Sequence, residues 1–426
     1  MSVAATLAEK IIARAAGLER VAPGEIVTCR VDLAMIHDSG GPRRVAPLLE
    51  RLGVGLWDAD RVVVVSDHYV PAVDAESAAI LDLTRRWVAA NGIRDFHDMR
   101  GICHVVLPEH GHLRPGLFVV GGDSHSPTGG AFGAFMFGVG ATDMAGVLAT
   151  GETWIRVPES RRIEWRGALG PGLTAKDMAL AQCAHLGLDG AAYGALEFAG
   201  PAVAALDMAE RMTLCNMAAE LGAQTGLVAP DQTTVDFLRA TGVEVAAFDD
   251  WRSDPDAAFT ADHEFDATAL EPQIALPDSP ANAVAVAAAG NVAIDQAYIG
   301  ACTGAKLLDL QRAAALLKGR QVAPGVRLLV APASTATTAA AAADGTLATL
   351  TAAGAILMPS GCGACAGYGA GVLAAGEVCI AATARNFKGR MGAPDSQVYL
   401  ASPYSVAAAA VADRIVDPRE FLEAGG

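Results

Sequence analysis

Short apolar runs, each ended by polar, proline or glycine residues, recur along the chain and alternate with helical patterns. The runs cover residues 26–31, 62–65, 117–120, 328–331 and 354–358. Segments between them with a helical spacing of apolar residues include 75–91 and 309–317. Because strand and helix follow one another repeatedly, the sequence predicts an α/β fold with mostly parallel sheets that helices cover on both faces.

The chain of 426 residues is longer than one ordinary domain, so more than one such module is expected. Segment 270–283 is rich in proline and polar residues, as is typical of a connector. A weaker boundary is expected at 157–159, where a helix is predicted to end before a strand at 162–165. Together these features predict three modules, which span residues 1–158, 159–287 and 288–426.

Charge and hydropathy exclude several classes of protein. The formal net charge of −16 argues against nucleic-acid binding, because neutralising phosphates requires a positive face. Glu9, Lys10 and Arg14 interrupt the apolar pattern at the start, unlike the core of a signal peptide. The most apolar tract, 333–358, is broken by Asp344 and Gly345, so it lacks the roughly 18 unbroken apolar residues of a membrane span. We therefore expect a cytoplasmic protein that contacts neither membranes nor nucleic acid.

The eight cysteines are expected to be thiols or metal ligands rather than disulfides, since no export signal is evident. Cys302 follows one apolar strand, and Cys362 and Cys365 form a C-x-x-C pair after another. The ends of neighbouring strands can bring three thiolates to one metal centre. The cysteines expected to be core residues, because their neighbours are apolar, are Cys29, Cys103, Cys183 and Cys379.

The spacing of these three cysteines leaves a zinc knuckle, a redox pair, a coincidence and an iron–sulfur cluster open. A structural zinc site needs four ligands, and no second C-x-x-C pair follows. A redox pair needs no distant third cysteine. Three thiolates without an evident fourth suit a four-iron cluster that leaves one iron open as a Lewis acid.

Polar side chains follow two of the predicted strands, where parallel sheets tend to hold ligands. Asp67 and His68 follow the second run, and Asp123 and His125 follow the third. We expect each histidine to be held by its nearby aspartate in a defined tautomer, as a proton donor to a leaving hydroxyl requires. His104, among apolar residues, is by itself typical of a core histidine.

Two further pairs have spacings that suit a binding site. Asn216 and Glu220 lie four residues apart, so one helix would place both on the same face. Arg385 and Arg390 lie five residues apart, and guanidinium groups bind carboxylates in a bidentate manner. Each pair alone is equally typical of an exposed helix or loop. Beside a metal centre they indicate a site for a dicarboxylate.

Six motifs in this order resemble the aconitase superfamily, most closely the large subunits of two-chain enzymes of the 3-isopropylmalate dehydratase and homoaconitase type. The motifs are SDHYVPA, GGDSHSPTGGAFGAFMFGVGATDMAGVLATGETWIRVPE, MTLCNMAAELGAQTG, IGACTGAKLLDL, PSGCGACAG and ARNFKGRMG. The resemblance implies three α/β/α modules packed around one [4Fe-4S] cluster per subunit. It also implies that Cys302, Cys362 and Cys365 are the ligands of the cluster.

The resemblance further implies roles for the polar residues. Asp67 and His68 match the pair that protonates the departing hydroxyl, and Asp123 and His125 match a second pair beside the cluster. The implied catalytic residues are Asp67, His68, His104, Asp123, His125 and Glu220. The implied substrate-binding residues are His37, beside Asp38, together with Ser124, Asn216, Arg385 and Arg390.

The chain departs from its relatives at two points. The stretch A-C-T-G around Cys302 stands where relatives read S-C-T-N, and A-R-N-F around Arg385 stands where many read N-R-N-F. Hydrogen-bonding side chains are therefore missing near the cluster and near one arginine. Such contacts tune both a metal and its ligands, so the departures bear on the substrate more than on the chemistry.

The implied activity is that of a hydro-lyase acting reversibly on a 2-hydroxy di- or tricarboxylate. Interconversion of 2-isopropylmalate and 3-isopropylmalate, a step of leucine biosynthesis, comes first. Hydration of maleate, citraconate or 2,3-dimethylmalate comes second, favoured by the two departures. A zinc or redox scaffold without catalysis, and an RNA-binding relative, are further alternatives, and the acidic charge disfavours the last.

A partner chain is also expected from the resemblance. Single-chain relatives end in a swivelling module that supplies a serine base and further arginines. The residues after ARNFKGRMG predict only a strand and a final helix, which is too little for such a module. We therefore expect a heterodimer in which a separate small subunit completes the active site around a small carboxylate substrate.

Overall fold

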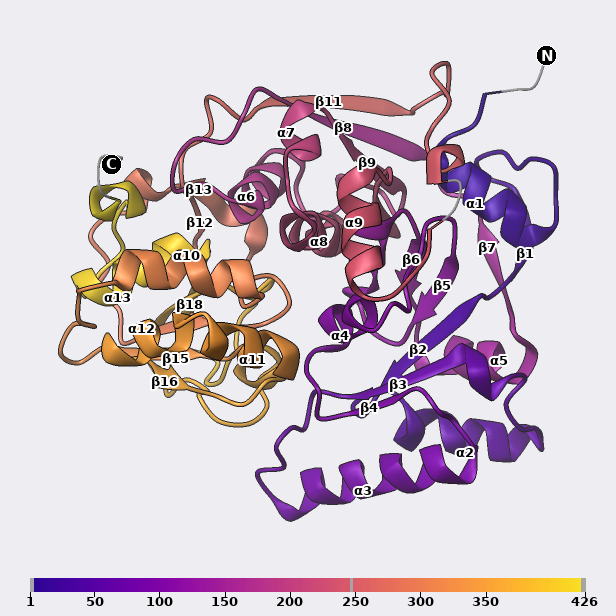
Figure 1. The fold of residues 1–426 in the computed structure, drawn as a ribbon, viewed down its shortest axis with the longest axis horizontal. Coiled ribbons are helices and arrows are strands. Elements are labelled where there is room, and N and C mark those ends of the chain that lie inside the picture. The colour runs from indigo at the N-terminus through magenta and orange to yellow at the C-terminus, as the bar shows by residue number, and fades with distance from the viewer. Residues whose placement is uncertain (1–3, 246–247, 423–426) are drawn as a thin grey trace.

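The structure is a computed structural model that describes residues 4–245 and 248–422. Its strands form four sheets, and the three larger ones are wholly or mostly parallel. In Figure 1 the first of these lies at the lower right, the second at the top and the third at the left. The α/β fold predicted from the alternation of strand and helix is confirmed.

The first sheet has five parallel strands in the order β4-β3-β2-β5-β6. They are β2 (Leu33–His37), β3 (Val62–Ser66), β4 (Phe96–Asp98), β5 (Phe118–Gly121) and β6 (Phe135–Gly138). Every residue of β2, β3 and β5 is buried, as expected of strands covered on both faces. The helices of this part are α1 (Leu7–Ala16), α2 (Pro42–Leu52), α3 (Ala75–Ala90), α4 (Cys103–Glu109) and α5 (Ala141–Thr150).

The second sheet is also parallel, in the order β10-β9-β8-β11. Its strands are β8 (Ser160–Arg166), β9 (Ala195–Ala199), β10 (Thr225–Val228) and β11 (Ala261–Asp266). Its helices are α6 (Ala175–Leu186), α7 (Pro201–Ala204), α8 (Met208–Asn216) and α9 (Gln232–Ala240). The helix expected to carry both Asn216 and Glu220 ends at Asn216, and a 3₁₀ helix, η3 (Met217–Leu221), follows.

The third sheet has seven strands in the order β13-β12-β18-β17-β14-β15-β16. They are β12 (Gln273–Ala275), β13 (Ala283–Ala285), β14 (Gln296–Ile299), β15 (Arg327–Val330), β16 (Ile356–Leu357), β17 (Val378–Ala381) and β18 (Gln397–Ala401). Its pairs are parallel except for the two that involve β12. The helices are α10 (Leu307–Leu317), α11 (Thr335–Ala343), α12 (Thr346–Ala352) and α13 (Pro403–Ala412).

Two local predictions are wrong. Segment 270–283 is not a mere connector, because β12 and the start of β13 lie in it and pair into the third sheet; its prolines flank the strands. The helix expected to end near 157 ends at Thr150, where Gly151 adopts a left-handed conformation (φ 72°). The strand β7 (Glu152–Arg156) follows and pairs antiparallel with β1 (Ile26–Arg30), so the first predicted strand stands outside the parallel sheets. The division into three modules stays a prediction.

One hydrophobic core joins the three larger sheets. It includes Met35 and Val63 from the first sheet, Ile163 from the second, and Ile299 and Val330 from the third. A second core lies on the other face of the first sheet, against α1, α2 and α5. The shared core fixes the sheets relative to one another, which matters because the site described below takes residues from all three.

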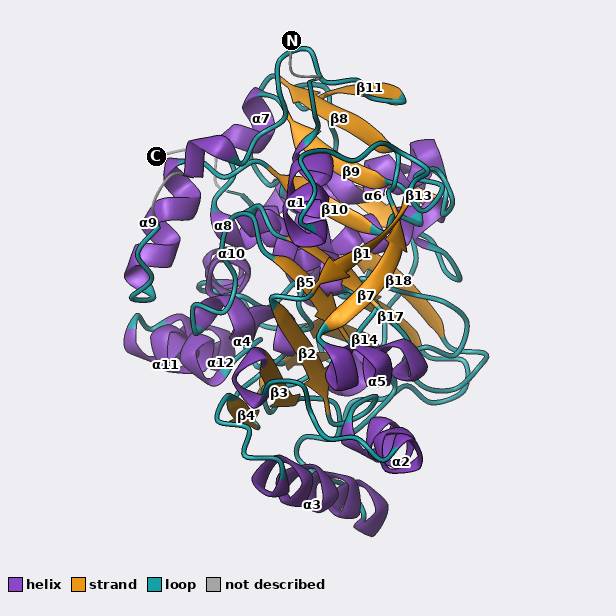
Figure 2. Cartoon of the chain, turned by 90° about the vertical axis from the view of Figure 1, so that its right-hand side faces the viewer, coloured by secondary structure: helices purple, strands orange, loops and turns teal. Residues whose placement is uncertain are grey.

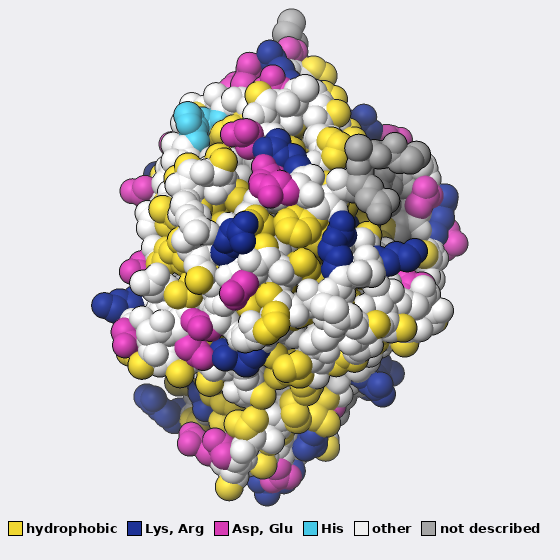
Figure 3. All heavy atoms as spheres, turned by 90° about the vertical axis from the view of Figure 1, so that its left-hand side faces the viewer, with side chains coloured by type: hydrophobic (Ala, Val, Ile, Leu, Met, Phe, Trp, Pro, Cys, Tyr) yellow, Lys and Arg dark blue, Asp and Glu magenta, His cyan; other side chains and the backbone are white. Residues whose placement is uncertain are grey.

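The outer layers of the molecule are helical and mixed in charge. Figure 2 shows helices flanking the strands on both sides. On the face shown in Figure 3, acidic and basic side chains are interspersed among apolar ones. Within the described ranges, none of the helices combines the length and apolar character needed to cross a bilayer.

Candidate active site

The carboxyl ends of strands from the first and third sheets line one cavity of about 330 Å³. The first sheet contributes the end of β2 and the loops after β3 and β5, and the third contributes the loops after β14, β16 and β17. The expected site residues that line the cavity are His37, Asp67, His68, His104, Asp123, Ser124, His125, Cys302, Cys362, Cys365, Arg385 and Arg390. Asn216 and Glu220 contact this lining from behind, through side-chain hydrogen bonds.

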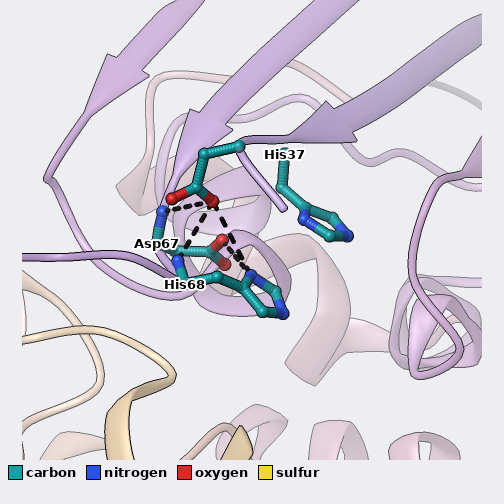
Figure 4. A group of neighbouring side chains, drawn as sticks. His37, Asp67 and His68 are labelled. Atoms are coloured by element: carbon teal, nitrogen blue, oxygen red, sulfur yellow. Dashed lines mark hydrogen bonds and ion pairs between the residues drawn. The ribbon is translucent and has the colours of Figure 1, made fainter. Parts of the chain in front are cut away.

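Asp67 and His68 form a buried ion pair directly after β3 (Figure 4). The Nδ1–H of His68 donates to Oδ1 of Asp67 at 2.7 Å. Burial disfavours the charged imidazole, but the Asp67 carboxylate outweighs it and raises the pKa of His68 to about 10. Burial alone would raise the pKa of Asp67, but the pairing with His68 outweighs burial and lowers this pKa to about 2. At neutral pH His68 is therefore an imidazolium, with Nε2 3.8 Å from the carboxylate of Asp123.

Asp38 and His37 support this pair. The Asp38 carboxylate accepts the backbone N–H groups of Asp67, His68 and Tyr69 at 3.3, 3.1 and 2.8 Å, which fixes the turn that presents His68. The ring of His37 stacks on that of His68, with the centroids 4.2 Å apart. Burial and the nearby His68 charge lower the pKa of His37, so a neutral ring lies against a charged one.

Asp123 lies against two histidines. Its Oδ1 accepts the Nε2–H of His104 and the backbone N–H of His125, both at 2.8 Å, and lies 3.6 Å from Nδ1 of the His125 ring, within ion-pair distance. The ring of His125 also bonds through Nε2 to Glu220 Oε1 at 3.0 Å. The ring of His125 therefore has the expected carboxylate beside it and a second, closer partner in Glu220. A 3₁₀ helix begins immediately after His125. The ring of His125 is paired with η3, which lies in the same part of the chain as the second sheet.

These contacts set the charges of the group. Although burial opposes ionisation, the hydrogen bonds from His104 and His125 hold the pKa of Asp123 well below its usual range. Burial likewise lowers the pKa of His125, but hydrogen bonds to Asp123 and Glu220 outweigh it and leave this pKa raised. The carboxylates therefore stay ionised and keep the imidazole rings in fixed orientations.

Arg385 and Arg390 lie in the loop after β17 and line the cavity. Arg385 donates through Nε to Glu220 Oε1 at 2.7 Å and through Nη1 to Ser124 Oγ at 2.8 Å. Arg390 donates through Nε to the carbonyl oxygen of Cys365 at 2.8 Å. A guanidinium group has five N–H donors, so both arginines keep donors that can bind a carboxylate in the cavity.

The three expected ligand cysteines all line the same cavity. Cys302 follows β14, and Cys362 and Cys365 follow β16. A hydrogen bond from Cys362 lowers the pKa of the Cys365 thiol to about 6, whereas burial raises that of Cys302 to about 12. A metal that binds these cysteines replaces their thiol protons. The difference in pKa then no longer matters, because every bound thiol is deprotonated.

The surroundings of Cys302 fit a thiolate cluster. Asn216 Nδ2 donates to Cys302 Sγ at 3.2 Å and to Thr128 Oγ1 at 2.8 Å, while its buried Oδ1 has no partner among the described residues. A hydrogen bond to sulfur stabilises a thiolate and tunes a bound cluster. Two buried thiols, one half-buried thiol and an amide donor are therefore a donor set that fits an iron–sulfur cluster.

A fourth cysteine, Cys103, also lines the cavity. It begins α4, and its backbone N–H donates to Asp67 Oδ2 at 2.7 Å. Burial raises the pKa of its thiol well above the usual range, so it remains protonated. Cys29, Cys183 and Cys379 are fully buried, in agreement with the prediction that they are core residues.

Two compact groups of imidazoles and carboxylates have the spacing to hold an ion. In each, the candidate ligand atoms lie within 4.8 Å of one another. The groups are His37, Asp38, Asp67 and His68, and His104, Asp123 and His125. Both are already linked by internal hydrogen bonds, which engage part of their ligand atoms.

Sequence reasoning missed three residues of the site region. Arg44 and Tyr368 line the cavity. Lys176 is buried behind it and bonds to Thr303, the neighbour of Cys302. The stretch TAKD around Lys176 signals a helix start, with Thr174 as its N-cap, but contains no signal for a metal or substrate site.

Comparison with known proteins shows which family the chain matches. The model of the aconitase family (aconitate hydratase) matches residues 9–292 and 287–413. A 3-isopropylmalate dehydratase large subunit 1 of Methanopyrus kandleri is 47% identical over 420 residues, which cover 98% of this chain and 99% of that protein. A probable methanogen homoaconitase large subunit of Methanothermobacter thermautotrophicus is 46% identical over 425 residues, or 98% of each chain. A 3-isopropylmalate dehydratase large subunit of Moorella thermoacetica is 43% identical over 421 residues, or 98% of this chain and 99% of that one.

Proposed function

This chain belongs to the aconitase family of hydro-lyases, and we propose that it is the catalytic large subunit of an enzyme that interconverts 2-isopropylmalate and 3-isopropylmalate. One observation carries the proposal. A charged His68, held by Asp67, lines the same cavity as three thiols and two arginines. A site that removes hydroxide from a hydroxy acid needs an acid, a means of polarising the hydroxyl group and cations for the carboxylates.

The proposed cofactor is one [4Fe-4S] cluster per chain, held by Cys302, Cys362 and Cys365. The family implies an iron–sulfur cluster, and the donor set around Cys302 fits one. When bound through three thiolates, the cluster supplies a Lewis acid that polarises a hydroxyl or carboxylate oxygen.

His68 is the proposed proton donor to the departing hydroxyl. Asp67 keeps the Nδ1–H bonded, so Nε2 carries the proton that can be delivered into the cavity. The stacked, neutral His37 adds no second positive charge that would expel this proton. In the hydration direction the neutral imidazole of His68 would accept a proton from water, which makes the step reversible.

Arg385 and Arg390 are the proposed carboxylate-binding residues, with Ser124 at the same wall. Glu220 fixes the guanidinium of Arg385 through Nε, and Ser124 accepts from Nη1, which leaves the remaining N–H groups for substrate. Asp123, His104 and His125 form the proposed second group, which orients this wall.

A separate small subunit is proposed to complete the site. The similar proteins are named as large subunits, which points to a second chain. The cavity wall of this chain supplies an acid and cations, and we assign the removal of the carbon-bound proton to a base on the partner. Anchoring the substrate between the two chains stabilises negative charge that develops on carbon.

The apolar part of the cavity supports an alkyl-substituted substrate. Val139 and Met144 line it beside the polar groups, and both could contact an isopropyl group. Homoaconitate chemistry is the second candidate, because a relative with that name is nearly as similar as those named 3-isopropylmalate dehydratase. Hydration of maleate, citraconate or 2,3-dimethylmalate remains a third, which the smaller side chain of Ala384 at the cavity would allow.

The test is activity of the two-chain enzyme, reconstituted anaerobically with iron and sulfide. Formation of the unsaturated acid would be followed by absorbance for each hydroxy acid of this panel. We expect the highest kcat/KM with 3-isopropylmalate. A preference for homocitrate, or for hydration of maleate, would replace the substrate but keep the reaction class, and inactivity on all acids in a protein loaded with iron and sulfide would overturn the proposal.

A further inference from the structure

Lys176 is a buried cation at the start of α6, a helix that packs against β12 of the third sheet. Only 1% of its surface is exposed. Its Nζ donates to Thr303 Oγ1 at 3.0 Å and to the carbonyl oxygens of Ala382 and Thr383 at 3.2 and 2.5 Å. All three acceptors are neutral, so they satisfy the donors of the ammonium without balancing its charge.

Within residues 4–245 and 248–422, no carboxylate forms an ion pair with Lys176. Lys306 provides the contrast, because this lysine is equally buried, at 5% exposure, and is paired with Asp309 at 3.1 Å. A buried charge without a counter-charge is strongly unfavourable. Burial accordingly lowers the pKa of Lys176 to about 8. Asp309, the carboxylate whose charge acts on Lys176, is itself paired with Lys306, so among the described residues the charge of Lys176 has no direct partner.

The acceptors of Lys176 belong to two loops of the active site. Thr303 directly follows Cys302, and Ala382 follows β17 on the way to Arg385. Thr303 Oγ1 also donates to the carbonyl oxygen of Ala382 at 2.9 Å. The loops touch because position 304 is glycine, since a Cβ there would lie 2.5 Å from the same carbonyl oxygen. Lys176 therefore joins the loop of a proposed ligand to the loop of a proposed substrate-binding residue.

We propose that Lys176 is the buried counter-charge of the thiolates of Cys302 and Cys365, and that its hydrogen bonds hold the Cys302 loop against the Arg385 loop. The inference rests on the proposed function, because the thiolates form only where a metal replaces their protons. Charge on these two sulfurs acts favourably on the ammonium. Lys176 is a positioning residue that reaches the cluster through charge and through Thr303, without touching substrate.

The test separates charge from hydrogen bonding in the reconstituted holoprotein. Lys176→Gln keeps a donor but removes the charge, and Lys176→Arg keeps the charge. For each protein, iron and sulfide content, the rate of iron release to a chelator and the midpoint reduction potential would be measured anaerobically. We expect Lys176→Gln to release iron at least about tenfold faster and to have a more negative potential, because a stabilising positive charge is lost. Lys176→Arg should stay close to wild type.

Arg211→Met is the matched control. Arg211 is also fully buried, but it is paired with Asp231 at 2.7 Å and does not line the cavity. Its loss should lower the free energy of unfolding and leave the reduction potential unchanged. A fold defect and a cluster defect are thereby told apart.

Three results would count against the inference. Wild-type iron release and potential in Lys176→Gln would overturn it while leaving the proposed function intact. Equal loss of the cluster in Lys176→Arg would show that charge is not the cause, and this variant decides if Lys176→Gln does not fold. Failure of the wild-type protein to retain iron and sulfide would overturn the proposed function itself, and this inference with it.

Discussion

The two walls of the cavity differ in how far they are complete without a cofactor. On the wall from the first sheet, each carboxylate has its partner: Asp67 holds His68, and Asp123 holds His104. Behind the wall from the third sheet, the charge of Lys176 has no direct carboxylate partner within the described part of the chain, and Asn216 donates to a thiol sulfur.

This difference shows a division of labour within one site. The acid–base wall is preorganised, since its protons are placed by hydrogen bonds already formed. The cysteine wall suits a cofactor that is held by soft thiolate ligands and that brings negative charge with those ligands. The positive charge behind this wall is therefore balanced only when the cofactor is bound. Changes on the first wall should therefore alter rate and pH dependence, whereas changes on the second should alter cofactor content.

The largest expected effect is on the cysteine wall. Cys302→Ser should abolish iron retention and lower activity by about three orders of magnitude or more, because the proposed cluster loses one of its three ligands. Metal and sulfide analysis after anaerobic reconstitution checks the prediction. Cys103→Ala is the matched control, since Cys103 lines the same cavity but begins α4, away from the loops that carry the three proposed ligands. Equal iron loss in both variants would contradict the assignment of Cys302 as a ligand and of Cys103 as a residue that only lines the cavity.

On the acid–base wall, His68→Asn should lower kcat by roughly 10²- to 10⁴-fold, the range for loss of a general acid. Iron and sulfide content should remain that of the wild type, because His68 bonds to Asp67 rather than to a thiol. Steady-state kinetics and metal analysis on the same preparation check both parts. A variant that keeps full activity would remove His68 from its proposed role.

Asp67→Asn should change the pH dependence of the acid–base wall. In the wild type the pKa of His68 is raised to about 10, so the imidazolium persists through neutral pH and is lost as the pH rises through that value. The stabilisation of the fold by this pair is fully present between about pH 4 and pH 6.5; it disappears toward pH 10 as His68 loses its proton and toward pH 2 as Asp67 gains one. Without the carboxylate the pKa should fall toward 6.5, and the alkaline limb of kcat/KM for dehydration should move down by up to about three pH units. An unmoved limb would contradict the assignment.

Arg385→Lys should act at the junction of the two walls. A lysine keeps the charge but cannot bind Glu220 and Ser124 as Arg385 does while also offering a bidentate face to a carboxylate. We expect kcat/KM to fall by about 10- to 100-fold, mostly through KM, with the iron content unchanged. Arg419→Lys, on an exposed arginine outside the cavity, serves as the control and should leave kcat/KM unchanged.

The smallest effect is expected behind the acid–base wall. Asp38→Asn should remove one of the three backbone hydrogen bonds to the turn after β3. The free energy of unfolding should fall by about 1–3 kcal/mol, with a modest loss of kcat. Chemical denaturation of the apoprotein checks the stability change. No change would show that the turn is fixed by other contacts.

Much of the fold could be predicted from the sequence, because local sequence patterns mark the ends of strands. The apolar runs before Asp67 and Asp123 are buried strands, and the parallel arrangement brings their carboxyl ends to one edge. The cysteines and arginines lie after strands of another sheet. That the two edges face one cavity depends on how the sheets pack, which no local pattern contains.

The partnerships inside the site were less predictable. Sequence proximity indicated Asp123 as a partner of His125, and it lies 3.6 Å from that ring, but the closer partner Glu220 is brought in by the second sheet. The break between α8 and η3 also lies inside what the four-residue spacing presented as one helix. Lys176 was missed because a lysine in a first helical turn is ordinary until its burial is known. Long-range packing, rather than residue type, decided each of these points.

The central claim is that the thiols of this cavity hold an iron–sulfur cluster, and metal analysis of the anaerobically purified chain tests it most directly. The account predicts brown protein with iron and acid-labile sulfide in equal amounts, in the ratio of one [4Fe-4S] cluster per chain. Colourless protein that contains stoichiometric zinc and lacks sulfide would contradict it.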